Sequence, residues 1–356
     1  MTPAAERERP APAGRRDGHT HTAFGLKLEL DPGLSIPGLA PAGSEAPPTG
    51  EAPVTGQAPP TGEAPAAGAG APTSRPTRVR LDPEELGRRW GALREAPRRV
   101  REVELEGERI RTIDQAEPAG YLLWNRDHGR VLISPDGGEL LCEPDPGNAG
   151  WTAIVAAQAL PLAATLRGLE VLHASGVVLD GGAVLVTGAA GAGKSSLAAA
   201  LVRAGGQLLS DDAVALEARG GALVAHAGSL ALQLREPEDE RLSAPERAAL
   251  GQPAGTVEGK RRYVSAAAPR PAPLRALFLL ERSAEQPAVE RLAAVSPFAL
   301  LGCTFNLSVR TPERLSRQLD VVAAMAAAGV VHRLRVQPGV DATMLAAVVR
   351  ERLAEL

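Results

Sequence analysis

The stretch Gly188-Ala189-Ala190-Gly191-Ala192-Gly193-Lys194-Ser195 decides the fold of this chain. It fits the phosphate-binding pattern G-x-x-x-x-G-K-[ST]. The apolar run at residues 183–187 predicts a buried strand before it, and residues 195–203 after it favour a helix. A glycine loop between a strand and a helix points several backbone N–H groups at one phosphate. The alternative is a Gly/Ala-rich turn that merely precedes a core helix.

The use of lysine supports the phosphate-binding interpretation. The chain has 39 Lys and Arg residues, yet Lys27, Lys194 and Lys260 are its only lysines. A lysine kept at position 194 indicates a chemical demand for a compact ammonium on a flexible stem. In this pattern the lysine reaches the β- and γ-phosphates and the following serine ligates Mg²⁺. We therefore expect ATP and Mg²⁺ as cofactors, held by residues 188–195 together with Ser196, with Ser195 as a metal ligand.

Composition excludes several classes of protein. The 356 residues are 44% hydrophobic but only 3% aromatic, and the net charge is −3. We expect no nucleic-acid partner, because no global basic field would attract one. We also expect no membrane association, because no apolar run of about 18 residues and no signal-like core are present. Two cysteines make neither a disulfide framework nor a metal cluster, which fits a reducing cytoplasm.

The chain divides by composition into three parts. Residues 1–21 are expected to be a disordered tail, and residues 22–150 a small β-rich lobe. Within that lobe, residues 41–76 carry a six-residue repeat of Pro, Gly, Ala and Thr that cannot bury a core, so we expect a disordered insert. Residues 151–356 are expected to be an α/β domain with a mixed, partly antiparallel sheet.

Individual elements follow from caps, turns and periodicity. The predicted strands cover residues 22–30, 169–179, 207–210, 230–234, 274–280 and 330–336, with hairpins turning at 106–107, 127–129 and 220–221. The predicted helices cover residues 82–95, with Asp82 as N-cap, 151–167, 311–328, and a last helix capped by Asp341.

Asp211 and Asp212 form the second half of the expected site. Phosphoryl transfer needs a carboxylate near the metal and often a second one that accepts the hydroxyl proton. The pair stands at the end of a predicted strand, and one helix and one returning strand separate it from the phosphate loop. The alternative is an ordinary cap or turn pair. His173, inside an apolar strand, is either a core residue or part of the site.

Three segments carry a resemblance to a known family. Leu172-His173-Ala174-Ser175, the phosphate loop and Leu208-Leu209-Ser210-Asp211-Asp212-Ala213-Val214 resemble the catalytic domain of HPr serine kinase/phosphorylase, and more narrowly its stand-alone serine kinase relatives. The resemblance is strong over residues 169–217. It implies a P-loop kinase domain, Asp211 as proton acceptor, Asp212 as a magnesium ligand and His173 as a site-lining residue. It also makes a homo-oligomer plausible.

The chain departs from that family at two points. Ser196 stands where an acidic residue usually follows the loop, and the Glu-x-Arg-Gly stretch tied to dephosphorylation is missing. Both departures argue against phosphorylase action. Lys260, Arg261 and Arg262 are candidates to hold phosphate or an acidic substrate, or they are a solvated basic turn.

The leading hypothesis is therefore an ATP-dependent kinase that phosphorylates a serine on a protein or peptide. One alternative is a small-molecule kinase. Another is a nucleotide-gated binding module with negligible turnover.

Overall fold

The computed structural model describes residues 20–42 and 75–356, except for positions 149, 258, 267, 284–286, 294 and 307. Most of the predicted tail and insert lies outside these residues. Thr20 and His21, which the predicted tail included, belong to strand β1 (Thr20–Ala23), and Pro41 of the predicted insert belongs to β3 (Ala40–Pro41). Both segments were therefore predicted too long.

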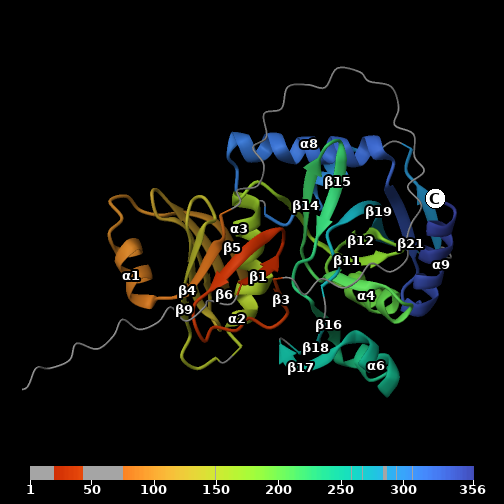
Figure 1. Ribbon diagram of the computed structural model, residues 1–356, viewed down its shortest axis with the longest axis horizontal. Helices are drawn as coiled ribbons and strands as arrows, with labels where there is room; N and C mark the ends of the chain where they lie inside the picture. The colour runs from red at the N-terminus through yellow and green to blue at the C-terminus, as the bar shows by residue number, and fades with distance from the viewer. Residues whose placement is uncertain are drawn as a thin grey trace, which may run out of the picture.

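The N-terminal lobe is built on one large sheet, drawn in red to yellow in Figure 1. Its strands lie in the order β3-β1-β2-β4-β9-β8-β7-β6-β5. Beside β1 and β3 they are β2 (Leu26–Leu30), β4 (Thr77–Leu81), β5 (Arg98–Leu105), β6 (Glu108–Ala116), β7 (Gly120–Asn125), β8 (Gly129–Ile133) and β9 (Glu139–Pro144).

Two local details of this lobe differ from the sequence prediction. The strand expected over residues 22–30 is the hairpin β1–β2, because Phe24 and Gly25 turn with φ of 53° and 74°. Helix α1 (Pro83–Gly91) begins as predicted, with the Asp82 carboxylate accepting from the Glu85 N–H at 3.0 Å. It ends at Gly91 instead of near residue 95.

One continuous helix connects the two halves of the chain. It consists of α2 (Thr152–Ile154), a π-helical turn (Val155–Ala159) and α3 (Leu160–Leu166), close to the predicted bounds. Leu160 packs in one hydrophobic cluster with Leu28 and Ile133 of the first sheet and with Ala213. The core therefore continues across residue 150, where we expected the lobe to end.

The second sheet carries the predicted mixed character. Its order is β10-β14-β15-β19-β12-β11-β13, with β21 on β19 and β20 on β21. Among the strand pairs that the described residues form in this sheet, only β12–β19 and β19–β21 are parallel. The strands are β10 (Glu170–Leu172), β11 (Ala174–Leu179), β12 (Gly182–Gly188), β13 (Gln207–Ser210), β14 (Val214–Arg219), β15 (Ala222–His226), β19 (Ala272–Arg282), β20 (Ala288–Arg291) and β21 (Val331–Val336).

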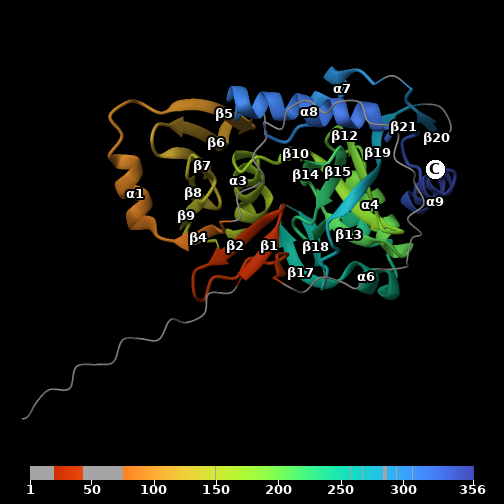
Figure 2. The same cartoon turned by 45° about the horizontal axis from the view of Figure 1, so that its top comes forward.

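Helices cover both faces of this sheet, as Figures 1 and 2 show. Alternate residues of β12 point to opposite faces, so Val184 packs with Leu197 of α4 while Leu185 packs in the cluster that holds Met325 of α8. The helices are α4 (Lys194–Arg203) and α9 (Ala342–Ala354) on one face, and α8 (Pro312–Ala328) on the other, next to the short α7 (Pro297–Leu301).

A third, small antiparallel sheet lies beside α4. It comprises β16 (Ala231–Arg235), β18 (Lys260–Val264) and β17 (Gln252–Val257), with α5 (Glu236–Asp239) and α6 (Ala244–Leu250) inserted after β16. The sequence predicted only β16. The inserted elements are short and broken by Pro and Gly, so no hydrophobic period marks them.

Candidate nucleotide-binding site

The predicted phosphate loop joins β12 to α4, in the strand-loop-helix context that the pattern requires. Its three glycines, Gly188, Gly191 and Gly193, have φ of 156°, 74° and 106°. L side chains rarely adopt these conformations. A Cβ on Gly188 would also lie 2.6 Å from the carbonyl oxygen of Leu280. The loop backbone therefore needs glycine, and the N–H groups of the first turn of α4 have no acceptor inside the helix.

Lys194 is folded onto its own loop. Its ammonium donates to the carbonyl oxygens of Gly188 at 3.1 Å and Ala189 at 3.3 Å, and the residue is only 7% exposed. Burial lowers the pKa of this ammonium, while the nearby carboxylates of Asp212 and Asp211 act in the opposite direction. A phosphate oxygen is a stronger, charged acceptor than these carbonyl groups. The ammonium is therefore well placed to exchange them for a phosphate.

Asp211 is buried at the end of β13 and bonded directly to the phosphate loop. Its Oδ1 accepts from the hydroxyls of Ser195 at 2.9 Å and Ser175 at 2.6 Å. Its Oδ2 accepts from the backbone N–H of Gln233 at 3.1 Å. Burial raises the pKa of this carboxyl, the neighbouring Asp212 adds to the rise, and these hydrogen bonds counteract it. Pairing of β13 with β11 brings the carboxylate back to the loop, as the sequence predicted.

Asp212 differs from Asp211 in its backbone conformation and in its exposure. Its φ is 74°, which turns the chain sharply after β13, and its side chain is 55% exposed in the cavity beside the loop. His173 lies next to it, with Nδ1 3.8 Å from Oδ1 of Asp212. The two acids therefore occupy different environments, one buried behind the loop and one facing the cavity.

His173 is not inside a continuous strand, contrary to the prediction. It stands at the break between β10, which pairs with β14, and β11, which pairs with β12 and β13. Its backbone N–H donates to the carbonyl oxygen of Cys303 at 2.7 Å, and its ring lies 6.1 Å from that of Phe305. Burial, and then the charge of Lys194, lower the pKa of the imidazole. The neutral ring is therefore favoured at the edge of the cavity.

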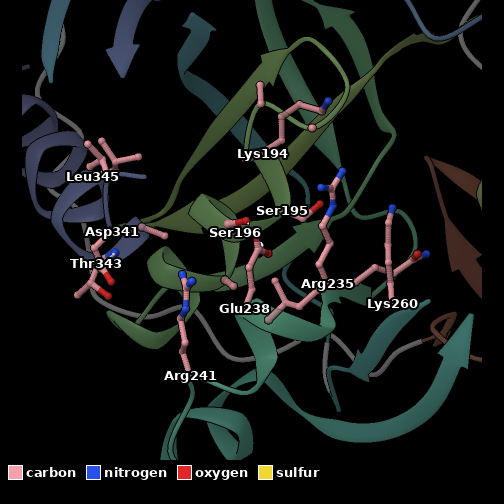
Figure 3. A pocket seen from close by; sticks show the side chains of 18 of the residues that line it. Lys194, Ser195, Ser196, Arg235, Glu238, Arg241, Lys260, Asp341, Thr343 and Leu345 are labelled. Carbon is pink, nitrogen blue, oxygen red and sulfur yellow. Dashed lines mark hydrogen bonds between the residues drawn. The ribbon is translucent and has the colours of Figure 1, made fainter. Parts of the chain in front are cut away.

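A cavity of about 540 Å³ opens beside the loop, and cations gather around it (Figure 3). Arg235, Arg241 and Lys260 line it, and none of them makes a side-chain hydrogen bond or ion pair to the described residues. Arg235 and Lys260 are cross-strand partners on β16 and β18. Unpaired cations around a glycine loop favour a polyanionic ligand.

The basic triplet that the sequence singled out is divided by the strand. Lys260 lines the cavity. Arg261 faces α5, where its guanidinium lies 3.9 Å from Glu236 and 3.8 Å from Asp239. Arg262 is buried, and burial lowers its pKa. Side chains alternate along β18, which turns Arg261 away from Lys260, and Arg262 is buried, so these three residues cannot act as one basic patch.

Among the cavity residues that the sequence did not predict, Arg235, Arg282 and Glu238 lie closest to the phosphate loop or contact it. A Cβ on Gly191 would lie 3.4 Å from the Arg235 guanidinium, and one on Gly193 would lie 3.8 Å from that of Arg282. Glu238 of α5 accepts from the Ser196 hydroxyl at 2.9 Å. A carboxylate therefore does stand next to position 196, supplied by another element. No local motif marks these residues, because the strands β16 and β19 and the helix α5, which are distant in the sequence, bring them to the loop.

The described residues contain neither an all-protein metal cluster nor a membrane-spanning helix. No group of three or more His, Cys, Asp or Glu side chains in this part of the chain could hold a metal ion alone. Of the helices in the same part, none combines the length and the apolar character needed to cross a membrane.

Comparison with known proteins gives little more. No family model matches the chain, and no curated protein does. Among solved structures it is similar to the Hpr(Ser) kinase/phosphatase from Coxiella burnetii, at 16% identity over 52% of this chain and 97% of that one, with a TM-score of 0.28. A similarity this low establishes neither a family nor a reaction.

Proposed function

We propose that this protein is an ATP-dependent kinase that transfers the γ-phosphoryl group to a serine hydroxyl on a protein or peptide. One observation carries the proposal. The serine of the phosphate loop, Ser195, donates a 2.9 Å hydrogen bond to Asp211, while Lys194 lies on the same loop. Phosphate-loop enzymes hold their magnesium between such a serine and such an aspartate.

The residues present fit a magnesium ion. Mg²⁺ prefers oxygen ligands and is usually bound by one or two carboxylates together with substrate phosphates. The Ser195 hydroxyl and the Asp211 carboxylate supply such oxygens beside the loop. When bound there, the ion neutralises charge on the β- and γ-phosphates.

The geometry favours exchanging the two roles that the family resemblance implies for Asp211 and Asp212. Asp211 is buried and bonded to Ser195, which suits a magnesium ligand. Asp212 faces the cavity, so we assign it the role of general base. The acceptor oxygen forms a bond to the γ-phosphorus as the bond to the β-phosphate oxygen breaks. The hydroxyl proton passes to Asp212 and ADP leaves.

Cations complete the proposed site. Lys194 binds the β- and γ-phosphates after leaving the loop carbonyls, and Arg235 and Lys260, which line the same cavity, stabilise charge on the transferring group. His173 lines the same part of the cavity, with its Nδ1 3.8 Å from the Asp212 carboxylate. The exposed carboxylate of Asp212 favours an enzyme over a nucleotide-binding module, because nucleotide binding alone does not require a general base. Serine as the acceptor is supported by the family resemblance.

Magnesium-dependent transfer of radiolabel from [γ-³²P]ATP tests the proposal. The acceptors would be a degenerate serine-peptide library and, in parallel, a panel of hydroxyl-bearing metabolites. We expect acid-stable phosphoserine, and its loss in Lys194→Ala, Asp211→Asn and Asp212→Asn. Arg261→Ala is the matched control, since this neighbouring cation faces α5, and it should keep full activity. Undiminished transfer in Lys194→Ala would refute the assignment, and label on metabolites alone would favour a small-molecule kinase.

A further inference from the structure

A buried arginine that the proposed reaction does not use lies close to the cavity. Arg262 of β18 is only 7% exposed. Its side chain makes no hydrogen bond and no ion pair to the described residues, and its Nε is buried without a partner. Burial lowers the pKa of the guanidinium, and no carboxylate of the described chain acts in the opposite direction. Because arginine keeps its charge in proteins, Arg262 is a buried cation without a counter-charge.

The other buried cations of the described chain show how unusual this is. They are Lys194 and Arg314. Arg314 lies 2.8 Å from the Glu170 carboxylate, and Lys194 donates to carbonyl oxygens of the loop where the phosphates are proposed to bind. Burying a charge without a partner costs far more free energy than burying an apolar side chain of the same volume. Arg262 therefore has the properties of a group that awaits an anion.

The small sheet places Arg262 beside the proposed reacting centre. Side chains alternate along β18, so Arg262 shares a face with Lys260 and not with Arg261. Its cross-strand partner on β16 is Gln233, and the Cβ atoms of such partners lie about 5 Å apart. Gln233 lines the cavity, and its backbone N–H donates to the Asp211 carboxylate at 3.1 Å.

The stem of Arg262 is covered, but its end is accessible. The two Nη atoms make no hydrogen bond, yet they are not among the fully buried nitrogens that lack a partner, so solvent reaches them. At one end of this sheet face the loop before β3 covers the strands, where the Leu230 N–H donates to the Gly38 carbonyl oxygen at 2.8 Å. At the other end Lys260 lines the cavity. Arg262 stands between these two ends.

A carboxylate of the acceptor is the anion that suits this position. A guanidinium binds a carboxylate through two parallel hydrogen bonds. The donor phosphates would occupy the cavity, which Arg262 does not line. Residues two apart on a strand are separated by about 7 Å, which is the separation of Arg262 from Lys260 along β18. An extended acceptor peptide covers the same distance in two residues.

We propose that Arg262 binds the carboxylate of an acidic residue two positions from the acceptor serine, so that the enzyme selects acidic acceptor segments. This inference rests on the proposed function and adds to it the residue that determines acceptor specificity. Arg262 acts on the binding of the acceptor and does not touch the reacting atoms.

Transfer from [γ-³²P]ATP by the full chain to a serine-peptide library tests the proposal. Each of the four positions on either side of the serine carries Ala, Glu or Lys in turn. We expect glutamate two positions from the serine to raise kcat/KM about tenfold over alanine, through a lower KM, and lysine there to lower it. Arg262→Met keeps the covered stem and removes the charge, so the ratio of glutamate to alanine should fall to about 1. Arg261→Met is the matched control on the opposite face and should keep the wild-type ratio.

A reversal of charge gives a result that a merely structural arginine would not give. Arg262→Glu should prefer lysine where the wild type prefers glutamate, and if this variant does not fold, Arg262→Met decides. A wild-type protein without preference for acid at any position would overturn the inference, as would an unchanged ratio in Arg262→Met. Transfer without acid preference leaves the proposed function standing, whereas the absence of transfer to every peptide contradicts that function and this inference with it.

Discussion

His332 makes the stability of this protein depend on pH in a way that can be measured. It lies in β21, is fully buried and stacks on Phe278 with ring centroids 5.2 Å apart. Neither ring nitrogen has a hydrogen-bond partner within the described chain. Burial, and then the charges of Arg352 and Arg291, lower the pKa of this imidazole from 6.5 to about 4. The ring is therefore neutral in the folded protein at neutral pH.

The sign of the effect follows from proton binding. Between pH 6.5 and about 4 the unfolded chain binds a proton at His332 that the folded chain does not. The free energy of unfolding must therefore fall as the pH is lowered through this window. At about 1.36 kcal/mol per pK unit, the loss between pH 7 and pH 5 is about 2 kcal/mol from this residue alone.

The perturbation is His332→Leu, which keeps a side chain of similar volume and cannot be protonated. Urea unfolding at pH 7 and pH 5 gives the free energy of unfolding for both proteins. We expect the difference between the two pH values to shrink by about 2 kcal/mol in the variant, whatever its stability at pH 7. An unchanged difference would show that the buried ring does not hold a lowered pKa, and would refute the reasoning.

Three other predictions concern the site and its support. Ser195→Ala should lower kcat/KM by at least about 100-fold, since the loop hydroxyl and its bond to Asp211 are lost, while circular dichroism melting stays within a few degrees of the wild type; near-normal turnover would contradict the magnesium assignment. Lys260→Ala should weaken ATP binding about tenfold in calorimetry, whereas Arg261→Ala should leave it unchanged, and equal losses would show that β18 does not divide the triplet. Glu170→Gln should lower the free energy of unfolding in urea by about 3–5 kcal/mol. The buried Arg314 guanidinium lies 2.8 Å from the Glu170 carboxylate and would lose its counter-charge. A loss below about 1 kcal/mol would mean that water reaches this pair.

Local sequence signals predicted those parts of the structure that depend on nearby residues. The strand, loop and helix around Lys194 follow from glycine spacing and apolar runs, and the caps at Asp82 and Asp341 from the side chains themselves. The turns predicted at Glu106-Gly107 and Gly220-Gly221 are confirmed, because all four residues have positive φ. The tail and the insert could not be bounded so well, because an edge strand such as β3 is stabilised by its partner β1 and not by its own sequence.

The candidate site divides in the same way. The phosphate loop and the acid pair were both found from the sequence, and the structure places them within hydrogen-bonding distance through Ser195 and Asp211. The environments of the two acids could not be read from the chain, because they depend on Ser175 and Gln233, which belong to other strands. Likewise no periodicity shows that His173 breaks a strand, since the break arises from β10 and β11 pairing with different neighbours.

The sequence by itself determined that a glycine loop with one lysine precedes a helix, because those backbone conformations and that helix depend on contiguous residues. Only the tertiary structure decided which charges face the loop. Arg235 and Lys260 reach it from a small sheet whose strands are short and carry no hydrophobic period, and Glu238 reaches it from the short helix α5. Their position is set by strand pairing and by packing against α4, interactions between segments that lie far apart in the chain.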